Sequence, residues 1–135
     1  MRTILVVEDF VPVQRFLREM LESQGYNTLG ASDASRAYDI LANQLQRAHL
    51  VITDYHMSHG SGYDLINKIK GNSNLENLPV IFLSAESDPA IIKKVERLGC
   101  VAWVKKPYRA QILLKEVEKA LMRNNAGQTQ MFLPR

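Results

Sequence analysis

Short apolar runs alternate with amphipathic helical patterns along this chain, and no other feature of the sequence constrains the fold as much. The apolar runs are four to seven residues long, a length typical of strands. Units in which a strand and a helix alternate form a parallel sheet with helices on both faces. The sequence therefore predicts an α/β fold with a five-stranded parallel sheet. We expect the strands at 4–7, 26–32, 50–53, 80–84 and 101–104, the second being the weakest.

The first helical pattern has apolar residues spaced by 3, 1, 3 and 1 positions, which places them on one face of a helix. Pro12 suits the start of this helix and Gly25 suits its end. Asp33 is expected to cap the second helix. The apolar residues of the first helix are Val13, Phe16, Leu17, Met20 and Leu21. The other helices are expected at about 34–44, 65–71, 91–99 and 113–121.

The composition is typical of one soluble globular domain, since 46% of the 135 residues are hydrophobic and 23% are charged. The first apolar run is too short for a signal peptide, and no run approaches the length of a membrane span. The single cysteine, Cys100, excludes an internal disulfide and suits the cytoplasm, where we expect the protein. A net charge of +3 is too small to indicate nucleic-acid binding.

The helical pattern stops after Arg123, which predicts a domain over residues 1–123 and a flexible tail over 124–135. Two interpretations of the tail are open. It is a loose terminus, or its apolar residues dock on a surface or a partner. Those apolar residues are Met131, Phe132 and Leu133.

Charged and polar residues end four of the five expected strands. In open parallel α/β sheets, ligands bind beyond the carboxyl ends of the strands. Because these ends lie along one edge of the sheet, we expect the side chains there to converge. The residues are Glu8 and Asp9 after the first strand, Asp54 after the third, Ser84 at the end of the fourth and Lys106 after the fifth.

Such a cluster suits phosphoryl chemistry. Three neighbouring carboxylates repel one another and need a cation, and an all-oxygen set suits Mg²⁺. Lys106 can meet a phosphate, Ser84 offers a hydroxyl, and Asp54 can act as a nucleophile that forms an aspartyl-phosphate. Each residue alone has a plainer explanation as a turn, a helix cap or a solvated loop. Their combination favours the functional interpretation.

Four motifs, "VVED", "ITDYHM", "FLSAE" and "VKKPY", resemble those of response-regulator receiver domains of the single-domain CheY type, over residues 1–123. The resemblance implies a flavodoxin-like (βα)5 fold and a role in bacterial two-component signalling. It also implies that Asp54 is the phosphoacceptor and Lys106 the phosphate-binding lysine, joined to Pro107 by a cis bond. The implied Mg²⁺ ligands are Glu8, Asp9, Asp54 and the backbone carbonyl of His56.

The resemblance assigns further roles around the site. Ser84 is the switch hydroxyl and Trp103 stands where the family has a switchable aromatic residue. His56 and Glu86 flank the phosphate and tune the lifetime of the aspartyl-phosphate. Two positions depart from the family: Ser58 replaces a proline, which is expected to leave the loop before Gly62 more mobile, and Trp103 is bulkier than the usual aromatic residue.

A histidine kinase or a histidine phosphotransfer protein is the implied phosphodonor, and a downstream protein is the implied target. The surface through which the family signals is basic here, and it is either a solvated face or a docking site for an acidic partner. The sequence shows no helix-turn-helix pattern, so we do not expect direct DNA binding. We expect a monomer or weak dimer. The basic residues are Lys93, Lys94, Arg97, Lys105, Arg109 and Lys115.

The resemblance implies a phosphoacceptor switch that catalyses only its own phosphorylation and dephosphorylation, and not an enzyme with an external substrate. One alternative is an aspartyl-nucleophile phosphohydrolase, but such enzymes carry a second Asp where this chain has His56. A second alternative is a receiver-like scaffold that works without phosphate, which Ser58 and Trp103 keep open. A third is a zinc or copper site at Asp54, His56 and His59. The sequence identifies neither the kinase nor the target.

Overall fold

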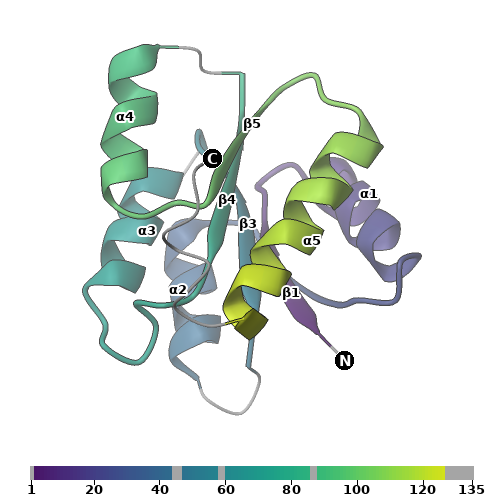
Figure 1. The fold of residues 1–135 in the computed structure, drawn as a ribbon, viewed down its shortest axis with the longest axis horizontal. Coiled ribbons are helices and arrows are strands. Elements are labelled where there is room, and N and C mark those ends of the chain that lie inside the picture. The colour runs from purple at the N-terminus through teal and green to yellow at the C-terminus, as the bar shows by residue number, and fades with distance from the viewer. Residues whose placement is uncertain (1, 44–46, 58–59, 86–87, 127–135) are drawn as a thin grey trace.

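A computed structural model describes residues 2–43, 47–57, 60–85 and 88–126, and it shows a sheet between two layers of helices (Figure 1). All neighbouring strands are parallel, and their order is β2-β1-β3-β4-β5. This is the flavodoxin-like order, so the predicted fold class is confirmed. The strands are β1 (Thr3–Val7), β2 (Asn27–Ala31), β3 (Leu50–Asp54), β4 (Val80–Ser84) and β5 (Ala102–Lys105).

Helices α1 and α5 cover one face of the sheet, and α2, α3 and α4 cover the other (Figure 1). The central strands are apolar throughout because successive side chains point to opposite faces. In β1, Ile4 packs in the core under α1 and α5, whereas Leu5 packs in the core under α2 and α3. The helices are α1 (Val11–Glu22), α2 (Ala34–Ala42), α3 (Gly62–Lys70), α4 (Pro89–Arg97) and α5 (Ala110–Ala126).

The residues expected to start and end the helices mostly do so. Pro12 lies in the first turn of α1, and Asp33 caps α2 by accepting a hydrogen bond from the backbone N–H of Arg36. Gly25 and Gly99 follow α1 and α4 with φ of 93° and 94°, a backbone conformation that favours glycine.

Most element boundaries differ from the sequence-based expectation by one to a few residues; β2, for example, is one residue shorter at each end than 26–32, and α2 ends at Ala42. Strand β5 begins and ends one residue later than 101–104, and α5 continues past Arg123 to Ala126. Met131, Phe132 and Leu133 lie outside the described residues, so the two interpretations of the tail and the domain limit at 123 stay predictions. Among the helices that the structure describes, none is long and apolar enough to cross a membrane.

Candidate functional site

Three of the predicted side chains meet at the carboxyl edge of the sheet. The ammonium nitrogen of Lys106 lies 3.0 Å from Oδ2 of Asp54 and 3.7 Å from Oε1 of Glu8. The side chains of Glu8 and Asp54 are only 5% and 13% exposed, so this lysine links two largely buried acids. The convergence expected from the parallel topology is therefore present for β1, β3 and β5.

Glu8 is a buried acid held in place by backbone groups. Its backbone N–H donates to the carbonyl of Ala31 at 3.0 Å, and its Oε2 accepts a hydrogen bond from the N–H of Phe10 at 3.0 Å. The pKa of Glu8 is raised to about 7, chiefly by burial and also by a hydrogen bond with Asp9 and the charge of Asp54, against the lowering effect of the Phe10 N–H and Lys106. Lys106 is therefore shared between two carboxyl groups, those of Glu8 and Asp54.

The loop after Asp54 folds back directly onto the end of β3. The N–H of Gly62 donates to the carbonyl of Tyr55 at 2.8 Å, and α3 begins at once. A Cβ atom at position 62 would lie 2.7 Å from the carbonyl oxygen of Asp54 and 2.5 Å from the ring of Phe82. Glycine is required here because any side chain would collide with the strand that carries Asp54.

Ser84 and Lys106 are joined through the backbone. Ser84 is 1% exposed at the end of β4, and its carbonyl accepts a hydrogen bond from the N–H of Lys106 at 2.9 Å. The Lys106–Pro107 bond is cis, as the resemblance implied. Tyr108 was not singled out in the sequence, yet burial raises its pKa, and the charges of Glu8 and Asp54 raise it as well. Its only sequence signal is its position directly after the lysine–proline pair.

Trp103 belongs to an aromatic cluster that reaches the site. Its ring centroid lies 5.5 Å from that of Tyr55 and 5.7 Å from that of Phe82, and Tyr55 directly follows Asp54. The indole N–H of Trp103 is buried and has no hydrogen-bond partner among the described residues. The tryptophan is thus packed inward against the residue next to the candidate phosphoacceptor.

Of the remaining predicted site residues, the structure describes His56. The side chain of His56 is exposed and its ring packs edge-on against Tyr55 at 4.8 Å. Ser58, His59 and Glu86 lie outside the described residues, so the zinc or copper alternative and the lifetime-tuning role of Glu86 are not tested. Within the described part of the chain, no three His, Cys, Asp or Glu side chains are arranged to hold a metal ion by themselves.

The acids nevertheless fit a hard divalent cation. Glu8, Asp9 and Asp54 offer carboxylate oxygens, and the charge of Asp54 is among the causes that raise the pKa of Glu8, after burial. Mg²⁺ needs only one or two carboxylates because it keeps several of its waters. A backbone carbonyl oxygen and water molecules can fill the coordination positions of Mg²⁺ that the side chains leave open.

A parallel sheet of this order with two acids and a lysine at its carboxyl edge defines a receiver-type protein, and comparison with known sequences agrees. The model of the response regulator receiver domain matches residues 4–118, so the chain belongs to that family. The chemotaxis protein CheY of Pseudomonas aeruginosa is 31% identical over 123 residues, which cover 90% of this chain and 98% of that protein.

Solved structures show the same relationship. A response regulator receiver domain protein from Clostridium thermocellum superposes with a TM-score of 0.86 at 26% identity, covering 95% of this chain and 100% of that one. The signal receiver domain of a histidine kinase from Syntrophus aciditrophicus superposes with a TM-score of 0.82 at 31% identity, covering 90% of this chain and 91% of that one. The predicted membership in a CheY-like receiver family of two-component signalling is therefore confirmed.

Proposed function

We propose that this chain is a phosphorylation-driven switch in which Asp54 takes a phosphoryl group from the phosphohistidine of a kinase or phosphotransfer protein. The observation that carries the proposal is the contact of Lys106 with both Asp54 and Glu8, at 3.0 and 3.7 Å. A lysine in this position neutralises the carboxylates now and can move to the phosphoryl oxygens once they arrive.

The chemistry follows from these positions. A carboxylate oxygen of Asp54 attacks phosphorus, the bond from phosphorus to the histidine nitrogen breaks, and the imidazole leaves with the electron pair. Lys106 and the hydroxyl of Ser84 balance the charge of the phosphoryl group that is left on Asp54. Glu8, Asp9, Asp54 and the carbonyl of His56 would hold Mg²⁺, which would neutralise negative charge on the phosphoryl oxygens. The chain acts on its own side chain, so no external substrate is turned over.

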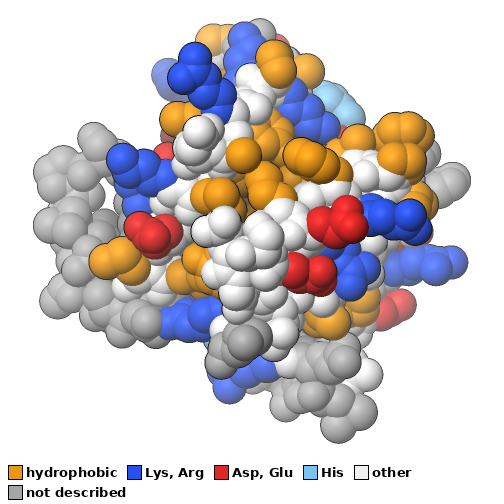
Figure 2. Space-filling model, turned by 90° about the vertical axis from the view of Figure 1, so that its right-hand side faces the viewer, with side chains coloured by type: hydrophobic (Ala, Val, Ile, Leu, Met, Phe, Trp, Pro, Cys, Tyr) orange, Lys and Arg blue, Asp and Glu red, His pale blue; other side chains and the backbone are white. Residues whose placement is uncertain are grey.

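Exposed apolar side chains on α1 and at its N-cap support a protein donor. Phe10 and Phe16 are each 61% exposed and Val11 is 56% exposed. Phe10 directly follows Asp9, so this surface begins at the acidic edge. Apolar side chains gather on the side of the molecule that carries α1 and α5 (Figure 2). A partner that covers this surface would present its phosphohistidine next to Asp54.

The output face is formed by α4, β5 and α5, and its basic residues are exposed. Lys94 also lies 4.2 Å above the ring of Tyr63 on α3, which holds one of these charges in place. We propose that phosphorylation draws Ser84 and Lys106 inward and shifts a two-state equilibrium of this face, which then binds an acidic protein. A full reversal of the equilibrium needs roughly 5 kcal/mol. The exposed basic residues that the sequence singled out are Lys93, Lys94, Arg97, Lys105, Arg109 and Lys115.

Incubation with acetyl phosphate tests the proposal directly. We expect the intact mass to rise by one phosphoryl group in the presence of Mg²⁺ and to stay unchanged with a chelator. No mass gain under either condition would refute the switch and favour the phosphate-independent scaffold. Steady release of product from small phosphate esters would instead support the phosphohydrolase alternative.

The single tryptophan reports whether phosphorylation reaches the output face. Because Trp103 packs against Tyr55, next to Asp54, we expect beryllofluoride with Mg²⁺ to change its fluorescence. Asp54→Asn is the control and should show no change. A protein that gains the phosphoryl mass but keeps its fluorescence would show that Trp103 does not take part in the switch.

Mg²⁺ binding is expected to depend on pH through Glu8. Its pKa of about 7 means that Glu8 carries a proton below that pH, and the proton must leave before the cation binds. Affinity should therefore rise with pH and level off above the pKa. At about pH 5.5 it should be about 30-fold weaker than at about pH 8. Calorimetric titration checks this, and Glu8→Gln should bind more weakly at all pH values and lose the dependence. A flat profile in the wild type would contradict the role of Glu8.

A further inference from the structure

The side chain of Gln14, in the first turns of α1, reaches back to the edge of the sheet. Its Nε2 lies 2.9 Å from the carbonyl oxygen of Glu8 and 3.2 Å from that of Ala31. Both neighbours are carbonyls and can only accept hydrogen bonds, so the amide must present its NH₂ group to them. Gln14 therefore donates two hydrogen bonds to the ends of two different strands.

These bonds close a ring around the backbone of Glu8. The N–H of Glu8 donates to the carbonyl of Ala31, Gln14 donates to that same carbonyl, and Gln14 also donates to the carbonyl of Glu8. The Glu8 carbonyl belongs to the peptide group that links Glu8 to Asp9. Gln14 thus fixes the peptide plane between the two acids, while the N–H of Phe10 fixes the Glu8 carboxylate.

Strand β2 provides the space for this contact. A Cβ atom at Gly30 would lie 2.1 Å from Oε1 of Gln14 and 2.7 Å from Nη1 of Arg18, distances that no packed side chain tolerates. Glycine at this position of the edge strand therefore lets the Gln14 amide lie over the strand and reach both carbonyls. The arrangement depends on a residue of α1 and a residue of β2 together.

We propose that Gln14 is a positioning residue that orients the Glu8–Asp9 pair for Mg²⁺ binding, and that Gly30 is required for its placement. The inference rests on the proposed function, because it concerns the acids assigned there to the cation. Groups that hold metal-binding residues in place by hydrogen bonds typically contribute 10- to 100-fold to metal affinity. Gln14 contacts the backbone of one such residue, so we expect an effect at the lower end of that range.

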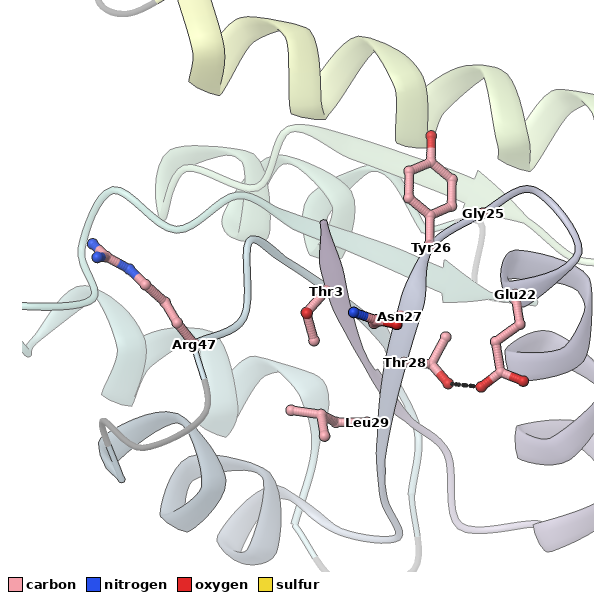
Figure 3. Close-up of a pocket in the computed structure, with 8 residues that line it drawn as sticks. All are labelled: Thr3, Glu22, Gly25, Tyr26, Asn27, Thr28, Leu29 and Arg47. Atoms are coloured by element: carbon pink, nitrogen blue, oxygen red, sulfur yellow. Dashed lines mark hydrogen bonds between the residues drawn. The ribbon is translucent and has the colours of Figure 1, made fainter. Parts of the chain in front are cut away.

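The same row of α1 supplies a matched control. Arg18, one turn after Gln14, donates from Nε to the hydroxyl of Thr28 at 3.0 Å, and that hydroxyl donates to Glu22 (Figure 3). These residues also tie α1 to β2, but toward the amino end of the strand, where Glu22 and Thr28 border a cavity of about 620 Å³. Arg18 makes a comparable tie between helix and strand without touching the acidic pair.

Calorimetric titration with Mg²⁺ at about pH 8 tests the proposal on the wild type, Gln14→Met and Arg18→Met. Methionine keeps a similar length and removes the donors. We expect the Kd for Mg²⁺ to rise about 10-fold in Gln14→Met and to stay unchanged in Arg18→Met, although both variants lose a tie between α1 and β2. Wild-type affinity in Gln14→Met, or an equal loss in Arg18→Met, would overturn the proposal.

Gly30→Ala provides a second, independent test. Its Cβ should displace the Gln14 amide and weaken Mg²⁺ binding to a similar degree, and it should add little when Gln14 is already methionine. If the effects of Gly30→Ala and Gln14→Met on the free energy of Mg²⁺ binding were fully additive, the proposal that Gly30 acts through Gln14 would be overturned. If the wild type itself bound no Mg²⁺, the proposed function would fail together with this inference. Normal wild-type binding that Gln14→Met leaves intact would overturn the inference alone.

Discussion

Asp54→Asn is expected to abolish phosphorylation by acetyl phosphate while the protein stays folded. Asparagine has the same shape, so the packing at the end of β3 is kept, but an amide oxygen is a far weaker nucleophile than a carboxylate. Of the acids at this edge, Asp54 is the one whose oxygen lies 3.0 Å from Lys106. Glu8 is held by the Phe10 N–H and hydrogen-bonded to Asp9, so neither is placed to substitute for it.

Intact-mass measurement after incubation with acetyl phosphate and Mg²⁺ checks this result, with circular dichroism to confirm the fold. Asp39→Asn is the matched control, because Asp39 is an exposed residue of α2 that lies outside the acidic edge. We expect the control to gain the phosphoryl mass as fully as the wild type. Retained labelling in Asp54→Asn would move the acceptor to another residue and remove the basis of the proposed function.

The fold was predictable because its signal is repeated along the chain. Strands β1, β3 and β4 bury residues on both faces of the sheet, so each is a continuous apolar run in the sequence. Parallel strands end along one edge, which is why acids at the ends of β1 and β3 were expected to meet the lysine after β5. The contacts of Lys106 with Asp54 and Glu8 agree with that expectation.

Element boundaries were less predictable because burial and backbone pairing are separate properties. The apolar run at 101–104 shows which residues are suited to burial, whereas β5 extends through Lys105, which pairs with Ser84 although its side chain is exposed. Helix α5 continues past the last apolar residue of its pattern, because residues with ordinary helix propensity can extend a helix that packing has already started.

Contacts that depend on two distant segments gave no signal in the sequence. Nothing in α1 distinguishes Gln14 from any other polar helix residue until Gly30 is brought opposite it. The aromatic cluster is similar, since Tyr55, Phe82 and Trp103 come from three separate parts of the chain. By contrast, the capping box of Ser61 and Asp64 at the start of α3 has a local pattern and was detectable in principle.

Phe82→Ala is expected to have the largest effect on stability. Phe82 is fully buried in β4, an inner strand between β3 and β5, and its ring packs against Tyr55 and Trp103. Truncating a buried phenylalanine removes its transfer free energy and leaves a cavity, which together cost about 3–5 kcal/mol. The backbone at Gly62 already lies close to the Phe82 ring and to the Asp54 carbonyl, because a Cβ there would be 2.5 Å from the ring and 2.7 Å from that oxygen, so little further collapse toward the cavity is expected. We therefore expect a loss in the upper part of the range.

Urea unfolding followed by far-UV circular dichroism measures the loss, and Phe16→Ala supplies the same chemical change at a site that is 61% exposed. The free energy of unfolding of this control should change by no more than about 0.5 kcal/mol. A typical domain is stable by about 5–15 kcal/mol, so the Phe82 variant should unfold at a much lower urea concentration. Similar midpoints for the two variants would show that Phe82 does not anchor the core beneath the site. A large loss confined to Phe82→Ala would show that the aromatic cluster beside Asp54 is part of the same cooperative core.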